Sequence, residues 1–286
     1  YKVNLNKKRK PKMFKRGTND TMDYFVSDDG RVLARERYDN KTNIHRVDAY
    51  IDNEWVKIFS EEAEVFHRSF VGVSPDQKHL VMRAFNEATQ KWAYYRMSLI
   101  NGDISEPIFS RNDRDVELVL TDINRVVYGV KYSGFTPTYE FFDKKLNARI
   151  KGVNKVLPNI SVSIQDHTPD WSSILFYIDG DQSSGDYIMY QNGGLASVAA
   201  ARPEIPGDAV HQVQQDEFEA RDGLIIPTLI TVPNNSKTEN LPTIVLPHGG
   251  PESYDRLGFD WLAQYFASQG YLIIQPQFRG SLGFGE

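Results

Sequence analysis

The segment His248-Gly249-Gly250-Pro251 holds the residues of this 286-residue chain that are best suited to chemistry. Two successive glycines let a backbone turn sharply and bring N–H groups close to a substrate carbonyl, which a Cβ would obstruct. Such N–H donors stabilise the negative oxygen that forms when a serine attacks an acyl group. We expect Gly250 to supply this oxyanion donor, and Pro251 to fix the chain direction after it.

His248 could be a general base in such a site. Where the nucleophilic serine lies in a G-x-S-x-G turn, however, the catalytic histidine follows the serine in chain order. We therefore expect His248 to shape and hydrogen-bond the turn. The 286 residues contain no G-x-S-x-G segment. The sequence thus predicts that the catalytic Ser, Asp and His are not present in this chain, that they lie downstream of Glu286, and that the chain alone is inactive.

The elements around the glycine turn predict how it is positioned. Residues 243 to 246 form a short apolar run without alternation, which predicts a strand buried on both faces. Residues 259 to 268 have helical spacing, with Gly270 as a C-terminal cap, and residues 271 to 275 predict the next strand. Strand, helix and strand make a right-handed parallel unit. The glycine-rich turn at 279 to 285 then marks the carboxyl edge of the sheet, where open α/β sheets bind ligands.

An internal repeat fills the first two hundred residues. A polar turn followed by an apolar strand recurs at Ser27, Ser74, Thr121 and Thr168, always 47 residues apart. A second pattern, in which two apolar strands flank a polar turn, recurs at residues 47–59, 96–109, 139–153 and 187–200. Each period therefore predicts about four short strands, which is typical of one blade of a β-propeller.

The repeat also predicts where the domains divide. Residues 1–205 are expected to form a partial β-propeller of about four and a half blades, because residues 1–14 fit the second half of a period. The segment from Arg202 to Gly207 reads as a linker. Residues 206–286 are expected to form the first part of an α/β-hydrolase domain, beginning with a hairpin over 217–232 around Asp222-Gly223. The chain is thus expected to be cut at both ends.

Other groups with chemical potential are better explained by structure. The basic run at residues 7–12 fits a solvated hairpin turn, and the glycines at 280, 283 and 285 do not form a phosphate-binding G-x-G-x-x-G. Asp170 belongs to a repeated turn. The remaining histidines lack metal-ligand spacing, and we expect structural or surface roles for them; they are His45, His67, His79, His167 and His211.

Composition bounds the function further. A net charge of -5 disfavours nucleic acid as a partner, and the absence of cysteine excludes disulfides and thiolate sites. No run approaches the roughly 20 apolar residues of a membrane span. We expect no cofactor or metal, a short peptide as substrate, and a soluble protein, whose compartment, cytoplasmic or periplasmic, the sequence leaves open. The sequence leaves self-association into a homo-oligomer open.

Three segments carry a resemblance to a known family, namely ARDGLIIPTLITVP, LPTIVLPHGGP and FASQGYLIIQPQFRGSLGFGE. With the repeats before them, they resemble the prolyl oligopeptidase (S9) family of serine peptidases, particularly its acylaminoacyl-peptidase and dipeptidyl-aminopeptidase-like branch. The resemblance implies a seven- or eight-bladed propeller that caps a hydrolase domain, with the active site between them. It also implies a Ser-Asp-His triad beyond Glu286 and an oxyanion N–H from Gly250.

Two further residues take roles from the resemblance. Arg279 matches the family's R-G motif, where we expect a structural role. Other branches carry a tyrosine near the position of His248 as an oxyanion donor, so this histidine indicates the acylaminoacyl-peptidase type. We do not expect Tyr254 to replace that tyrosine.

Two alternatives stay open at this point. One is a carboxylesterase with the same fold and oxyanion turn, since fold does not determine substrate. The other is a non-catalytic propeller scaffold with a degenerate hydrolase domain. Reaction with a serine-directed fluorophosphonate separates the scaffold from both enzymes.

Overall fold

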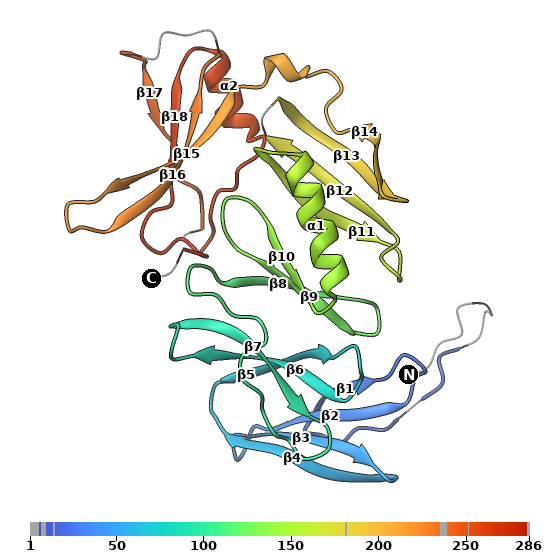
Figure 1. Cartoon of the computed structure of the whole chain (residues 1–286). Helices are drawn as coiled ribbons and strands as arrows, with labels where there is room; N and C mark the ends of the chain where they lie inside the picture. The colour runs from blue at the N-terminus through green and yellow to red at the C-terminus, as the bar shows by residue number, and fades with distance from the viewer. Residues whose placement is uncertain are drawn as a thin grey trace. The chain divides into compact units, whose positions relative to one another are not determined.

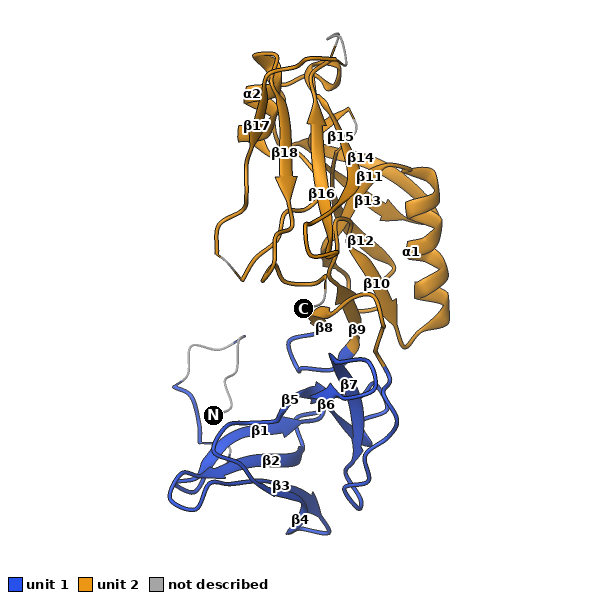
Figure 2. Ribbon diagram, turned by 90° about the vertical axis from the view of Figure 1, so that its left-hand side faces the viewer, with its two compact units in different colours: residues 1–108, 121–127 blue, residues 109–120, 128–286 orange. Residues whose placement is uncertain are grey.

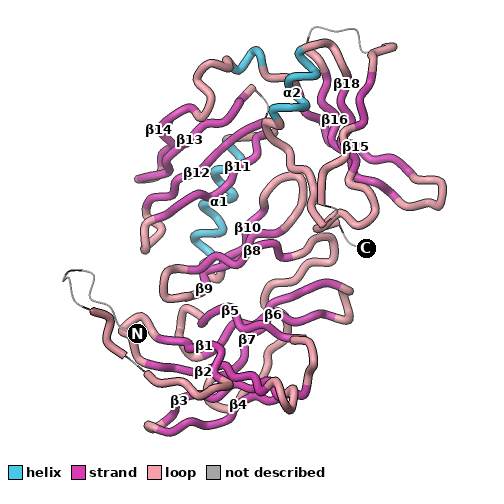
Figure 3. The backbone as a smooth tube through the Cα atoms, turned by 180° about the vertical axis from the view of Figure 1, so that it is seen from behind, coloured by secondary structure: helices cyan, strands magenta, loops and turns pink. Residues whose placement is uncertain are grey.

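Strands dominate the structure, a computed structural model that describes residues 6, 10–13, 15–180, 182–234, 239–250 and 252–284 (Figure 3). The chain divides into two compact units, one of residues 1–108 and 121–127 and one of residues 109–120 and 128–286 (Figure 2). The strand expected over residues 1–5, together with Lys7, Lys8 and Arg9 of the basic run, lies outside the described residues. Pro251 of the expected oxyanion turn does so too.

The first unit contains two antiparallel sheets built from consecutive strands (Figure 1). The first sheet has the order β1-β2-β3-β4, with strands Thr21–Val26, Val32–Asp39, Ile44–Ile51 and Glu54–Glu62. The second has the order β5-β6-β7, with strands Arg68–Val73, His79–Asn86 and Lys91–Ser98. Where the repeat predicts a fourth strand, the described chain forms one antiparallel bridge between Met97 and Ile104.

The 47-residue repeat marks the same turn in successive sheets, as predicted. Each turn joins the first and second strands of its sheet, and a short polar side chain closes it. The Ser27 and Ser74 hydroxyls donate to Asp29 and Asp76, and the Thr168 hydroxyl donates to Asp170 at 2.7 Å. In the third turn an aspartate closes the turn, because the carboxylate of Asp122 accepts from the backbone N–H of Val126 at 2.8 Å. These turns need a short side chain that bonds its own turn backbone. The same residue types therefore recur every 47 residues, which makes the period visible in the sequence.

The second unit continues with two more antiparallel sheets. One has the order β10-β9-β8, with strands Thr138–Phe141, Val127–Tyr132 and Val116–Thr121. The other has the order β11-β12-β13-β14, with strands Ile160–His167, Ser173–Gly180, Ser183–Gln191 and Gly194–Ala200. Between these sheets in the sequence lies helix α1, Lys144–Val156.

Helix α1 corrects the prediction of a strand, a turn and a strand over residues 139–153. Only β10 forms there as a strand, and Asp143 then caps the helix by accepting from the Lys145 N–H at 2.7 Å. Leu146, Ile150 and Val153 recur at helical spacing and form its buried face. They pack in one cluster with residues of β10 to β13, so α1 covers the core of these two sheets (Figure 1).

A mixed sheet closes the chain, with the order β15-β16-β18-β17. Its strands are Gln212–Glu219, Ile225–Val232, Leu272–Pro276 and Thr243–Val245, and the short 3-10 helix η1, Gly207–Ala209, precedes them. The predicted hairpin is confirmed, because β15 and β16 pair antiparallel around residues 220–224. The predicted parallel pair is confirmed as well, since β17 pairs with β18 in parallel.

The prediction that residues 243–246 are buried on both faces is wrong for β17. This strand lies at the edge of the sheet, and Val245 is 62% exposed. Its only strand neighbour among the described residues is β18, and the exposure of Thr243 and Val245, which share one face of the strand, shows that this face is uncovered. A run of apolar residues indicates that both faces of a strand are suited to burial. It does not indicate which elements lie against those faces.

Helix α2, Trp261–Ser268, joins β17 to β18 as the spacing predicts. Asp260 caps its start, and Gly270 follows its end with φ +89°. Ala263 and Ala267 are buried, whereas Trp261 is 67% exposed. The small side chains of Ala263 and Ala267 let the helix lie close to the sheet. The helix therefore packs through this face, and Trp261 and Tyr265 point to solvent.

A buried histidine holds a charged cluster in the first unit. His45 on β3 is fully buried, and its Nε2 lies 2.8 Å from Glu36 while its Nδ1 lies 3.3 Å from Glu61. Burial alone would lower the pKa of His45. The hydrogen bonds and charges of the two glutamates outweigh burial and raise that pKa above its usual value of 6.5. The charged imidazole therefore stabilises the fold at low pH, and this contribution is lost as pH rises through the raised pKa.

We predict that His45→Gln lowers the free energy of unfolding most below pH 6.5, by about 3 kcal/mol, because it removes the cation beside the buried Glu36 carboxylate, whereas Glu61 keeps its ion pair with Arg68. The difference from the wild type should shrink as pH rises. Chemical denaturation from pH 5.5 to 8.5 measures it. His79→Gln is the matched control, because His79 is part-exposed, and it should cost no more than about 0.5 kcal/mol. A His45→Gln effect that is constant over this range would contradict the prediction.

Candidate functional site

The expected oxyanion turn follows β17 at its carboxyl end. The N–H of Leu246 still bonds to the Ile274 carbonyl at 2.8 Å, and the backbone then leaves the sheet. Gly250 has φ +141°, a conformation open in practice only to glycine. A Cβ built there would lie 2.8 Å from the N atom of Glu252. The turn therefore needs a glycine at position 250, whereas a Cβ at Gly249 would meet no atom within 4 Å.

His248 joins this turn to the glycine-rich turn after β18. Its ring stacks on Phe278 with centroids 4.4 Å apart, and its Nε2 lies 2.7 Å from the Ser281 hydroxyl oxygen. Its Nδ1 lies 3.0 Å from the Gly249 carbonyl oxygen. A carbonyl oxygen can only accept, so Nδ1 carries a proton in this contact. The ring thus links residues 249 and 281, in line with the turn-shaping role expected for His248.

The contact between Ser281 and His248 has the length of a contact between a nucleophile and its base, but its surroundings differ from those of a catalytic pair. Ser281 is 6% exposed, and its hydroxyl also lies 2.6 Å from the Phe278 carbonyl oxygen. The other ring nitrogen of His248 faces a carbonyl rather than a carboxylate. This serine therefore holds two turns together. Sequence reasoning passed over it, although it stands directly after Arg279-Gly280.

The glycine-rich turn is fixed from two further sides. The Leu282 N–H donates to the Ser253 carbonyl at 3.0 Å, which ties it to the segment after the oxyanion turn. The Ser133 hydroxyl donates to the Gly283 carbonyl at 3.0 Å. Gly283 has φ +84°, and a Cβ there would lie 2.5 Å from the Ser133 Cβ. The β9–β10 loop therefore supports this turn at close range.

The segment from Ser253 to Gly258 is held by backbone bonds rather than by helix. The Leu257 N–H donates to the Phe135 carbonyl at 2.8 Å, and the Asp255 N–H donates to the Gln277 side chain at 2.9 Å. Burial raises the pKa of Asp255, although its contact with Gln277 opposes that shift. The Tyr254 hydroxyl donates to Glu117 at 2.6 Å, so it is engaged away from an oxyanion.

Arg279 and His211 have structural contacts. The Arg279 guanidinium donates to Asp222 in the β15–β16 turn at 2.6 Å, and both side chains are exposed. The backbone of His211 exchanges two hydrogen bonds with the side chain of Gln264 on α2. These contacts tie the start of the mixed sheet to its helix and its second glycine turn.

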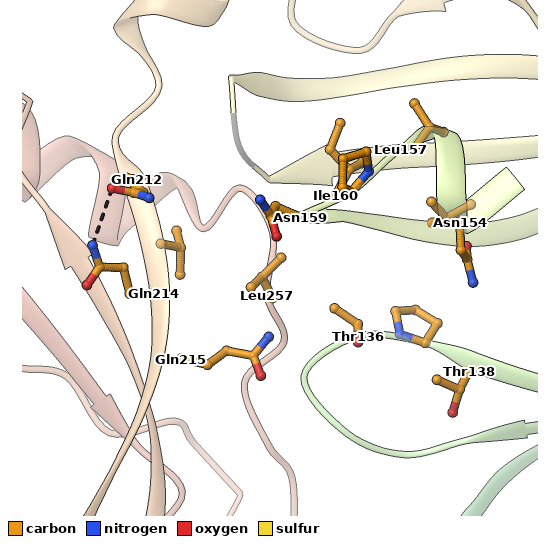
Figure 4. Close-up of a pocket in the computed structure, with 14 residues that line it drawn as sticks. Thr136, Thr138, Asn154, Leu157, Asn159, Ile160, Gln212, Gln214, Gln215 and Leu257 are labelled. Carbon is orange, nitrogen blue, oxygen red and sulfur yellow. Dashed lines mark hydrogen bonds between the residues drawn. The ribbon is translucent and has the colours of Figure 1, made fainter. Parts of the chain in front are cut away.

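A cavity of about 610 Å³ lies in the second unit, away from the oxyanion turn (Figure 4). Its wall comes from the β9–β10 loop, the end of α1, the start of β11, and β15. The lining holds amides and hydroxyls but no charged side chain, and none of residues 248–250 or 281 reaches it. The cavity offers no titratable group, so the expected oxyanion turn stays the candidate for acyl-transfer chemistry.

Two features that the described residues lack bear on other classes of function. No cluster of three or more His, Asp or Glu side chains there is arranged to hold a metal ion. Within the same residues, neither helix has the length and apolar character needed to cross a bilayer. What this site offers, among the described groups, is a turn whose backbone conformation requires a glycine, together with the contacts that hold it.

Comparisons with known proteins point in one direction. No protein-family model matches the chain. Dipeptidyl aminopeptidase BIII from Pseudoxanthomonas mexicana is 26% identical over 157 residues, which are 52% of this chain and 23% of that protein. The fold resembles that of puromycin hydrolase, with a TM-score of 0.57 at 14% identity over 92% of this chain and 42% of that one.

A third comparison agrees with these two. The Pyrococcus horikoshii acylaminoacyl peptidase structure gives a TM-score of 0.52 at 16% identity, over 88% of this chain and 39% of that one. The chain thus spans less than half the length of each of these three proteins. At these identities the solved structures show a shared fold, in which strands predominate and helices are few.

We predict that Gly250→Ala lowers the free energy of unfolding by about 1–3 kcal/mol, because alanine cannot adopt the φ of this turn without strain. Gly249→Ala is the matched control, and its open surroundings predict a change within about 0.5 kcal/mol. Denaturant titration of the two variants measures both values. Equal losses of unfolding free energy in the two variants would show that the turn does not require a glycine at position 250.

Proposed function

Because the chain is related to peptidases of the prolyl oligopeptidase family, we propose that the protein containing it is a serine peptidase of short peptides. The observation that carries the proposal is the conformation of Gly250 at the carboxyl end of β17. A parallel strand that leads into a glycine turn with φ +141° is suited to present backbone N–H groups to an acyl oxygen. Relatives named as peptidases make a peptide bond the favoured substrate over another acyl compound.

In the proposed reaction the protein uses a Ser-Asp-His triad that lies in sequence beyond this chain, because residues 1–286 contain no nucleophile turn. The serine attacks the peptide carbonyl, and the Gly250 N–H stabilises the oxygen as its charge develops. His248 and Ser281 keep the turn in place without taking part in proton transfer. A donor fixed in this way lowers the barrier, because it need not reorganise during the reaction.

We also propose the domain division expected from the sequence. Residues 1–205 would contribute about four and a half blades of a propeller that limits access to the nucleophile, and residues 206–286 would begin the hydrolase domain. The shared turn of successive sheets supports the first part. The mixed sheet that starts at β15 with a parallel β17–β18 pair supports the second.

We predict that the full-length protein is labelled by a fluorophosphonate at one serine and hydrolyses dipeptidyl or N-acyl-aminoacyl nitroanilides. Residues 1–286 expressed alone should show neither property, and heat-denatured full-length protein is the control for nonspecific labelling. Mass spectrometry of the labelled peptide identifies the serine. No labelling of the native protein would remove both enzymatic alternatives and favour a scaffold. Labelling with turnover of nitrophenyl esters alone would favour a carboxylesterase.

A further inference from the structure

A single carboxylate in the second unit collects three donors. Glu117 on β8 accepts from the Tyr254 hydroxyl at 2.6 Å, pairs with Lys131 Nζ at 2.9 Å, and bonds to the Arg256 guanidinium. The side chains of Lys131 and Glu117 are 15% and 23% exposed, so water screens this pair only partly, whereas the Arg256 side chain is 48% exposed. Because Lys131 and Arg256 both pair with Glu117, the negative charge of Glu117 is needed to hold the two cations close together.

Two of these donors belong to the segment that follows the oxyanion turn. Tyr254 and Arg256 come four and six residues after Gly250, and Arg256 also donates to the Tyr254 hydroxyl at 3.2 Å. The Tyr254 ring packs edge to face on Phe284, with centroids 5.9 Å apart. The bonds to Glu117 therefore act on both glycine turns, through the tyrosine hydroxyl on one side and its ring on the other.

The tyrosine remains a donor over the working range of an enzyme. Burial is the largest cause that raises the pKa of Tyr254 to about 12, and the bond to Glu117 adds to it. Its hydroxyl thus stays protonated at neutral pH, and Glu117 is the acceptor that fixes its direction. The guanidinium of Arg256 stays charged as well, since its neighbours raise an already high pKa.

We propose that Glu117 is a positioning residue for the oxyanion turn, acting through Tyr254 and Arg256. This inference rests on the proposed function. Without the carboxylate charge, Lys131 and Arg256 are two uncompensated cations side by side, and the Tyr254 hydroxyl loses its charged acceptor. The segment that leaves Gly250 is then free to shift, and a displacement of even 1 Å at an oxyanion donor slows the reaction strongly.

The test compares Glu117→Gln with a matched control in the full-length protein. Glutamine keeps the shape and an acceptor oxygen but removes the charge. Glu140→Gln is the control, because Glu140 accepts from the Tyr132 hydroxyl at 2.8 Å in the same sheet, and among the described residues no hydrogen bond or ion pair joins its side chain to residues 248–250 or 252–256. Both variants remove the charge of a glutamate that accepts from a tyrosine. They differ because Glu117 is bonded to the segment after the oxyanion turn and Glu140 is not.

We expect Glu117→Gln to lower kcat about tenfold with little change in KM, because the oxyanion donor acts in the transition state. Glu140→Gln should leave kcat within about twofold. Kinetics are measured with a nitroanilide substrate well below the melting temperature of each variant. A purely structural Glu117 would lower the melting temperature and leave kcat of the folded enzyme unchanged, and that result would overturn the inference.

Tyr254→Phe provides a second test that survives a folding defect in Glu117→Gln. It removes one hydrogen bond and keeps the ring on Phe284, and we expect kcat to fall about threefold. The double variant should be no slower than Glu117→Gln, because both changes break one connection. A Tyr254→Phe enzyme with wild-type kcat would overturn the inference. A wild-type protein that neither reacts with fluorophosphonate nor turns over substrate would instead remove the proposed function itself.

Discussion

The hydrogen bond between His248 and Ser281 joins two turns that lie 33 residues apart in the sequence. Each turn leaves the carboxyl end of a strand in one parallel pair, and each contains a glycine with positive φ. A backbone in these conformations gains little from its own regular hydrogen bonds, so side chains and neighbouring loops must hold it. The stacked and doubly bonded imidazole does this from one side, and Ser133, Phe135 and Glu117 do it from the other.

The residues of this site have two kinds of role. Gly250, the proposed donor, has a backbone conformation that a residue with a Cβ could adopt only with strain, and the surrounding contacts hold the glycine in it. Asp255 shows the cost of support, because its carboxyl is buried beside Gln277 and its pKa is raised. Because glycine has many accessible backbone conformations, a donor at residue 250 keeps one direction only when several contacts determine the same geometry.

Local features of the fold were readable from the sequence, and contacts between distant segments were not. The repeated turns were visible because Ser27, Ser74 and Thr168 bond within a few residues of themselves. Helix α1 was missed because the repeat was extended over Leu146, Ile150 and Val153, whose helical spacing indicated otherwise. The burial of β17 was overestimated, since a sequence does not show which element covers a strand face.

In the candidate site, too, local features could be predicted from the sequence and contacts between distant segments could not. The importance of Gly250 followed from residue type and from its place after a predicted strand, and the structure gives it a conformation that requires glycine. Ser281 and Glu117 gave no comparable signal, because each becomes meaningful only through a partner far along the chain. Glu117 and Tyr254 are 137 residues apart, and only the fold brings them together.

The structure of the full-length protein after reaction with a fluorophosphonate tests the role of Gly250 most directly. If Gly250 supplies the oxyanion donor, one phosphonyl oxygen will lie about 2.7–3.1 Å from its amide nitrogen. Its φ will also remain close to the value in the unreacted turn. An adduct on Ser281, or a phosphonyl oxygen more than about 3.5 Å from the Gly250 nitrogen, would contradict the assignment.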